Sequence, residues 1–117
     1  MKSMEDKRLE LIAYGKVQGI GFRTYILIKG RELGVNGYVR NKSNNTIEVV
    51  AEGSEKNLMK LKNFVESGYF PARIEKVHAY WSPATREFNN FEIKYTIWGE
   101  ERVNEKDKQK DTTPKEK

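Results

Sequence analysis

Residues 15–21 form a glycine-rich run, Gly-Lys-Val-Gln-Gly-Ile-Gly, and Arg23 follows it closely. Three glycines among seven residues suit a strained turn rather than a helix or a strand. If a helix begins after this loop, its unpaired N–H groups and its dipole favour an anion, and consecutive loop amides add a concave site for phosphate oxygens. The guanidinium of Arg23 can grip a phosphate through paired hydrogen bonds. The pattern is neither a Walker A motif nor G-x-G-x-x-G, and composition alone leaves open a tight turn beside a solvated arginine.

The second candidate is Asn41, which ends the run Gly37-Tyr38-Val39-Arg40-Asn41. Its side-chain carbonyl can accept a hydrogen bond from a water molecule. Most asparagines that come just before a hairpin are turn residues. The residue type therefore allows a catalytic role for Asn41 but does not select it.

Composition excludes several other chemistries. The chain has no cysteine, so disulfides, thiol catalysis and thiolate metal sites are excluded. His78 is the single histidine, which excludes a metal site with several histidines. We expect His78, in a strand away from both candidate motifs, to be a structural or surface residue.

The net charge of +5 lies entirely in the central part of the chain. Residues 11–95 hold 13 basic and 8 acidic side chains, whereas residues 1–10 and 96–117 are each balanced. An anionic ligand is therefore expected for the central part. Charge alone does not distinguish a phosphate ester, an acyl phosphate and a nucleic acid.

The elements that must position these residues begin with a strand at 8–14 and a helix at 22–33, which Gly34 ends. Two strands follow at 35–43 and 46–52. Asn44-Asn45 joins them, because asparagine tolerates the left-handed backbone of a tight hairpin.

The second half predicts a helix at 54–67, capped by Ser54 and ended by Gly68. A strand at 72–81 contains a slip in its apolar phase between Ile74 and Val77, which indicates a bulge. A fifth strand alternates Phe91, Ile93, Tyr95 and Ile97. This order predicts an α+β, ferredoxin-like split βαβ sandwich, with two helices on one face of a mostly antiparallel sheet.

We expect a domain at 8–97 and a charged, disordered C-terminal tail at 98–117, because the tail is too polar to offset its ordering entropy. The N-terminal residues are too polar for a signal peptide, and no run approaches the roughly 20 apolar residues of a membrane span. A cytoplasmic monomer without membrane association is expected.

A resemblance settles what the two motifs leave open. The run Gly15-Lys16-Val17-Gln18-Gly19-Ile20-Gly21-Phe22-Arg23 resembles the first signature of acylphosphatases, and the run ending at Asn41 resembles their second. The spacing between the two also matches, and the similarity extends over about residues 8–95. The departures are Ile20 for valine and Tyr38 for tryptophan, both of which keep apolar bulk, together with Asn44-Asn45 in the hairpin and the charged C-terminal extension.

The resemblance implies a hydrolase that splits carboxyl-phosphate bonds of a small-molecule acyl phosphate, with inorganic phosphate as product and inhibitor and with no metal or cofactor. It implies that Arg23 and the loop amides bind the phosphoryl group and that Asn41 positions the attacking water. The phosphate-binding loop would comprise Gly15, Lys16, Val17, Gln18, Gly19, Ile20, Gly21 and Phe22 with Arg23.

The alternative is a non-catalytic phosphate- or RNA-binding ferredoxin-like module. We do not expect nucleic acid, because the chain lacks an RNP1-like run and its aromatic residues do not cluster on one central strand. Lys16 and Arg40 flank the two motifs, and we expect both to be solvated surface charges.

Overall fold

The computed structural model describes residues 5–18, 21–69 and 72–95, and its elements follow the predicted order. The five strands are β1 (Lys7–Lys16), β2 (Asn36–Asn41), β3 (Ile47–Gly53), β4 (Arg73–Pro83) and β5 (Phe91–Ile93). The two helices are α1 (Phe22–Leu33) and α2 (Glu55–Ser67).

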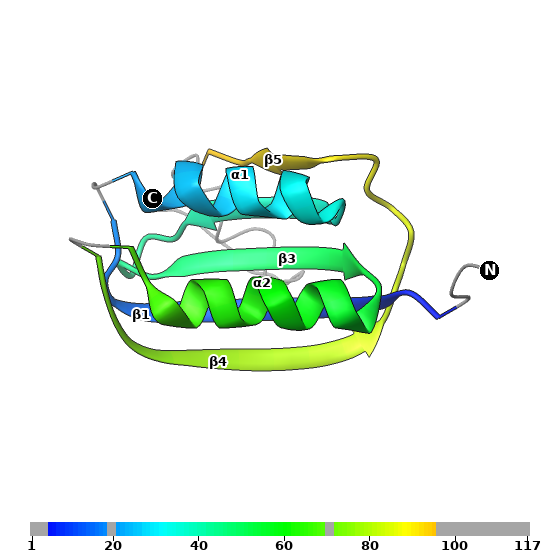
Figure 1. The fold of residues 1–117 in the computed structure, drawn as a ribbon. Helices are drawn as coiled ribbons and strands as arrows, with labels where there is room; N and C mark the ends of the chain where they lie inside the picture. The colour runs from blue at the N-terminus through cyan, green and yellow to red at the C-terminus, as the bar shows by residue number, and fades with distance from the viewer. Residues whose placement is uncertain (1–4, 19–20, 70–71, 96–117) are drawn as a thin grey trace.

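The strands form one sheet in the order β4-β1-β3-β2-β5, and both helices cover the same face of it (Figure 1). All neighbouring strands are antiparallel except β2 and β5, which run parallel. This is the ferredoxin-like α+β sandwich that the sequence predicted.

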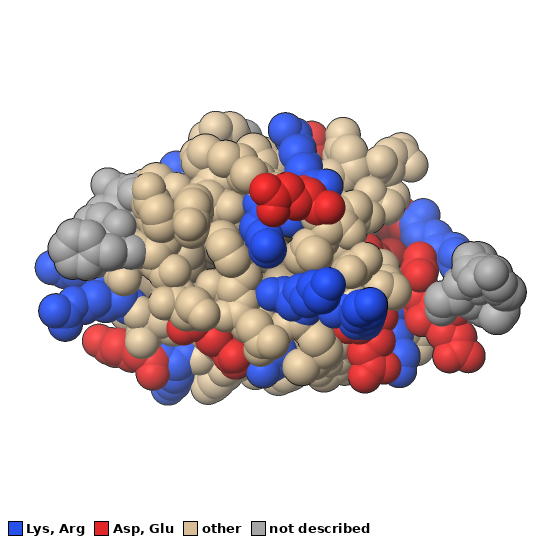
Figure 2. All heavy atoms as spheres, in the orientation of Figure 1, with Lys and Arg blue, Asp and Glu red and all other residues tan. Residues whose placement is uncertain are grey.

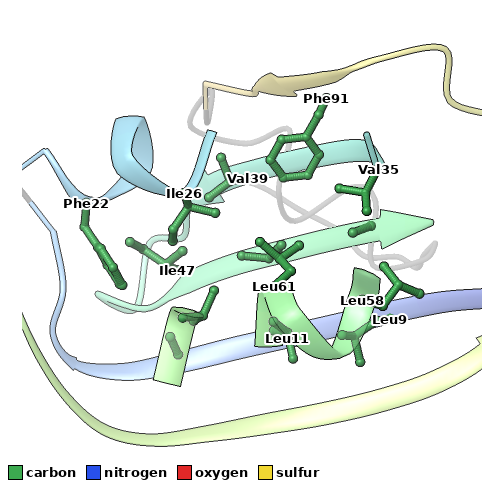
Figure 3. Packing of buried hydrophobic residues seen from close by; sticks show 14 of the residues in the cluster. Leu9, Leu11, Phe22, Ile26, Val35, Val39, Ile47, Leu58, Leu61 and Phe91 are labelled. Atoms are coloured by element: carbon green, nitrogen blue, oxygen red, sulfur yellow. The ribbon is translucent and has the colours of Figure 1, made fainter. Parts of the chain in front are cut away.

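The core lies between the helices and the sheet. Strand alternation places Leu9 and Leu11 of β1 on the covered face, where Leu58 and Leu61 of α2 meet them (Figure 3). Ile26 of α1 completes the same layer. All five side chains are fully buried, and each stabilises the fold by about 1.5–3 kcal/mol.

The N-cap of α2 and the glycines that end both helices lie where the sequence predicts them. The Ser54 side chain accepts a hydrogen bond from the backbone N–H of Asn57 at 3.2 Å, which caps α2. Gly34 adopts a left-handed backbone after α1, and its N–H donates to the carbonyl of Arg31. Gly68 ends α2 with a positive φ of 75°, and its N–H donates to the carbonyl of Val65.

The two local irregularities predicted from the sequence are confirmed. Asn45 has a positive φ of 65° in the β2–β3 hairpin. In β4, Lys76 pairs with Tyr14 and Ile74 with Gly15, so Glu75 is the extra residue of a bulge.

The bounds of β1 to β4 differ from expectation by one or two residues at each end: β1 includes Gly15 and Lys16, which were expected in the loop, and β2 ends at Asn41 instead of residue 43. β4 extends two residues further than predicted, to Pro83, because β1 continues to pair with it as far as Lys7. The regular part of β5 ends at Ile93. The predicted continuation to Ile97 lies in part, and the predicted tail at 98–117 entirely, outside the described residues.

The connection from β4 to β5 carries the chain from one edge of the sheet to the other (Figure 1). Glu52 of β3 holds it, because its carboxylate accepts hydrogen bonds from the N–H and hydroxyl of Thr85 and from the N–H of Arg86, at 2.8–2.9 Å. Arg8 of β1 also donates to Glu52, at 3.1 Å. This network fixes the point from which the chain enters β5.

Candidate active site

The loop between β1 and α1 begins inside the sheet. Gly15 has a φ of 135°, and a side chain there would overlap the carbonyl oxygen of Arg73 in β4. Glycine is therefore required for β1 to pass the bulge of β4. Val17 points into the core and is only 2% exposed, whereas the Lys16 side chain is exposed. The start of the loop is thus held by the close approach of Gly15 to β4 and by the burial of Val17 in the core.

Gln18 connects this loop to the β2–β3 hairpin. Its side-chain Nε2 donates to the carbonyl oxygens of Lys42 and Thr46, each at 2.9 Å. The only donor atom of the Gln18 side chain is therefore committed to the hairpin, and a contribution of Gln18 to an anion site would come from its backbone N–H. A cavity of about 230 Å³ lies between the two segments, and it is lined by Gly15, Lys16, Val17, Gln18 and Asn45. Gly19 and Ile20, both predicted to bind phosphate, lie outside the described residues.

The N-terminus of α1 has the features of an anion site. Gly21, with a φ of 83°, precedes the helix, and the first turn has no acidic side chain. Phe22 is buried in the core, which holds this end of the helix in place (Figure 3). The first N–H groups of a helix lack intrahelical acceptors, and the helix dipole adds positive potential at the same end.

Arg23 is the second residue of α1, and its side chain extends toward β5. Its guanidinium carbon lies 5.4 Å from the centroid of the Tyr95 ring. This distance is within the range of a cation–π contact. The sequence did not predict this contact, because Tyr95 was interpreted only as one of the alternating residues of the fifth strand.

Asn41 is the last residue of β2, two residues before the predicted end of this strand, and it pairs with Ile47 of β3. Paired residues of neighbouring strands share a face, so Asn41 lies on the helix-covered face together with the buried Val39. Its side-chain Oδ1 is buried. The structure thus places Asn41 at the end of the sheet where the glycine loop and the N-terminus of α1 also lie (Figure 1).

Arg40 corrects one sequence-based expectation. It was expected to be a solvated surface charge, but only 8% of it is exposed, and its Nε donates to the Glu48 carboxylate at 2.7 Å. Strand alternation directs Arg40 to the face opposite Asn41. Its charge is therefore engaged with Glu48 of β3 on the other side of the sheet.

His78 is an exposed residue of β4, as expected for a surface role. Its ring is 5.2 Å from that of Tyr14 and 6.5 Å from that of Tyr80. In the part of the chain that the structure describes, no group of three acidic or histidine side chains could hold a metal ion. No helix formed by the described residues is long and apolar enough to cross a membrane.

Charge is mixed over the helix-bearing face. Figure 2 shows Lys and Arg side chains interspersed with Asp and Glu there, without a continuous basic patch. Nucleic-acid surfaces are typically basic stripes or patches. The positive end of α1 is thus a local site and not part of a broad basic surface on this face.

Fold and site together define a class: a ferredoxin-like α+β domain that presents a glycine loop, a helix N-terminus, an arginine and an asparagine at one end of its sheet. The family model for acylphosphatase matches residues 9–93. The acylphosphatase of Mycobacterium sp. (strain KMS) is 36% identical over 91 residues, which cover 78% of this chain and 97% of that protein.

Solved structures agree with this assignment. The acylphosphatase from Bacillus subtilis superposes with a TM-score of 0.73 at 26% identity, covering 76% of this chain and 99% of the other. The acylphosphatase from Coxiella burnetii superposes with a TM-score of 0.71 at 27% identity, covering 77% of this chain and 94% of the other. The chain belongs to the acylphosphatase family, and this membership supports an acylphosphatase enzyme rather than the non-catalytic alternative.

Proposed function

We propose that the protein hydrolyses small-molecule acyl phosphates without a metal, using the loop at 15–21, Arg23 and Asn41. The observation that carries this proposal is the N-terminus of α1, which has no acidic residue in its first turn and bears Arg23 as its second residue. Asn41 ends the strand at the same end of the sheet. Inorganic phosphate, the product, would compete for this site.

The phosphoryl group would bind against the loop amides and the first N–H groups of α1, with the Arg23 guanidinium on its oxygens. Lys16 would add positive potential from the edge of the cavity that it lines. The Gln18 hydrogen bonds to the hairpin support this assignment, because they hold the loop in one geometry relative to the end of β2. A preorganised site of this kind stabilises developing charge at little reorganisation cost.

Asn41 would orient the attacking water, whose O–H donates a hydrogen bond to the side-chain carbonyl of Asn41. The water oxygen bonds to phosphorus as the bond from phosphorus to the carboxyl oxygen breaks, and that electron pair leaves with the carboxylate. A carboxylic acid has a pKa near 4–5, so the carboxylate departs without a general acid. The proton from water passes to a phosphate oxygen. Positioning and charge stabilisation are the main demands of such a transfer.

We also infer a monomer that acts in the cytoplasm. The monomer is supported by the core, which both helices and the sheet close within the described residues. Light scattering of the purified protein at assay concentration should give a mass near 13.7 kDa, and a mass near twice that value would reject the monomer.

The roles of Arg23 and Asn41 separate in one experiment. Arg23→Ala should lower kcat/KM for benzoyl phosphate by about 10³-fold and weaken inhibition by phosphate. Asn41→Ala should lower kcat by roughly 100-fold while phosphate inhibition stays near the wild-type value. Lys60→Ala and Asn63→Ala, on the exposed side of α2, are the matched controls. Wild-type turnover in both site variants would show that the site is elsewhere.

A further inference from the structure

The ring of Tyr95 faces Arg23, whose guanidinium carbon lies 5.4 Å from the ring centroid. Tyr95 is 68% exposed, so its ring contributes little to the core. Packing in the core therefore does not explain why a large aromatic side chain lies beside the arginine that is proposed to bind phosphate. The cation–π contact between the two side chains offers an explanation.

The backbone beneath Tyr95 is fixed to β2. Ile93 pairs with Val39, and the N–H of Lys94 donates to the carbonyl of Val39 at 2.9 Å. Tyr95 follows directly and, by alternation, shares the helix-covered face with Ile93. Asn41 lies two residues beyond Val39, just as Tyr95 lies two residues beyond Ile93. Because β2 and β5 are parallel, Tyr95 is level with Asn41 at the end of β2.

The helix that carries Arg23 is fixed to the same strand at its other end. A side chain at Gly30 would collide with the ring of Phe91, and Arg31 Nε donates to the carbonyl of Phe91 at 2.9 Å. α1 and β5 therefore run in opposite directions, with Gly30 against Phe91 at one end and Arg23 against Tyr95 at the other. The positions of Arg23 and Tyr95 relative to each other are therefore set by backbone segments that are both fixed in place.

We propose that Tyr95 is a positioning residue, whose ring holds the Arg23 guanidinium for the phosphoryl group. An arginine side chain loses considerable rotamer entropy when it is ordered, and a ring that already restrains it reduces the loss on binding. The guanidinium carbon lies over the ring, 5.4 Å from its centroid, and the π-face of a ring attracts a cation without supplying a conventional hydrogen-bond acceptor. The ring therefore restrains Arg23 without occupying the donors that a phosphate needs. This inference rests on the proposed role of Arg23.

The test compares Tyr95→Leu, which removes the ring, with Tyr95→Phe, which keeps the ring and removes the hydroxyl. Tyr80→Leu is the matched control, because Tyr80 is also exposed, at 57%, but lies on the opposite edge strand. Tyr95→Leu should lower kcat/KM for benzoyl phosphate by roughly 3- to 10-fold and weaken phosphate inhibition to a similar extent. Tyr95→Phe and Tyr80→Leu should stay within about twofold of the wild type.

Phosphate affinity, measured by calorimetry, separates positioning from a purely structural role. In an Arg23→Ala background, Tyr95→Leu should cause no further loss of phosphate affinity, because the ring acts through the guanidinium. An equal loss in both backgrounds would overturn the proposal, as would wild-type values for Tyr95→Leu or equal losses for Tyr95→Phe or Tyr80→Leu. If the wild type shows no turnover, the proposed function fails, and the phosphate affinities still decide the role of Tyr95.

Discussion

Gly30 of α1 lies against the ring of Phe91 in β5 so closely that a β-carbon on Gly30 would be 2.5 Å from two of the ring carbons. Real β-carbons do not approach other atoms this closely, so the glycine is what allows the helix to rest on this strand. The contact sets the distance between the helix that carries Arg23 and the strand that leads to Tyr95.

Gly30→Ala should therefore destabilise the protein by about 1–3 kcal/mol, because overpacking outweighs the gain in helix propensity. Urea unfolding measures the change. Thr24→Ala, at an exposed position of the same helix, should change the free energy of unfolding by less than about 0.5 kcal/mol. An equally stable Gly30→Ala protein would show that α1 and β5 are not packed as described.

Gln18 should be needed for activity more than for stability. Gln18→Ala removes both hydrogen bonds to the hairpin and frees the loop, and we expect kcat/KM for benzoyl phosphate to fall by roughly 10- to 100-fold. The free energy of unfolding should fall by only about 1–2 kcal/mol, as for two part-buried hydrogen bonds.

Gln18→Glu tests the hydrogen bonds to the hairpin more specifically than Gln18→Ala does. It keeps the size of the side chain but places a carboxylate against the carbonyl oxygens of Lys42 and Thr46, where no proton is available to share. It should lose at least as much activity as Gln18→Ala. Full activity in Gln18→Glu would mean that this link does not position the loop.

Glu52 should make stability depend on pH. Burial raises the pKa of Glu52, but hydrogen bonds from Thr85, Arg86 and Arg8 outweigh it, so its pKa in the folded state lies below the ordinary value. A depressed pKa contributes stability above the unfolded-state pKa, and that contribution is lost as the pH falls through the folded-state value. Stability should accordingly decline on acidification below about pH 4.5, the ordinary glutamate value.

Glu52→Gln checks this assignment. The variant should be less stable by about 1–3 kcal/mol at pH 7, and the difference should shrink in acid as the wild-type carboxylate is protonated. Glu66→Gln, which removes an exposed carboxylate paired with Lys62, should cost less than about 0.5 kcal/mol at either pH. A difference for Glu52→Gln that is the same at pH 7 and pH 3.5 would contradict the assignment.

We propose that residues 8–97 form the catalytic domain and that the charged residues 98–117 are not needed for it. A chain that ends at Ile97 should keep its turnover of benzoyl phosphate, and its Tm should move by less than about 2 °C. A loss of turnover at unchanged Tm would instead assign part of the site to the C-terminal residues.

Local signals predicted much of this fold. α1 begins after Gly21 and ends before Gly34, and α2 follows Ser54, because the backbone requirements of helix ends select these residue types directly. The bulge at Glu75 was also visible, since a slip in apolar phase marks the point where a strand changes its pairing.

The errors concern contacts between distant residues. Arg40 was expected in solvent, but its partner Glu48 lies across a strand pair whose register only the folded hairpin defines. The assignment of Gln18 to phosphate stays a prediction, but the hydrogen bonds of its side chain to Lys42 and Thr46, which are 24 and 28 positions away, were not predicted. The contact between Arg23 and Tyr95 depends on how α1 lies over β5, which no local pattern records.

The most direct test of the account is hydrolysis of benzoyl phosphate by the purified protein in ¹⁸O-labelled water, with EDTA present. Attack by water on phosphorus at a metal-free site predicts turnover that EDTA does not abolish, competition by inorganic phosphate, and the label in the phosphate product. Absence of turnover in folded protein, turnover that EDTA abolishes, or label in the benzoate would contradict the roles given to Arg23 and Asn41.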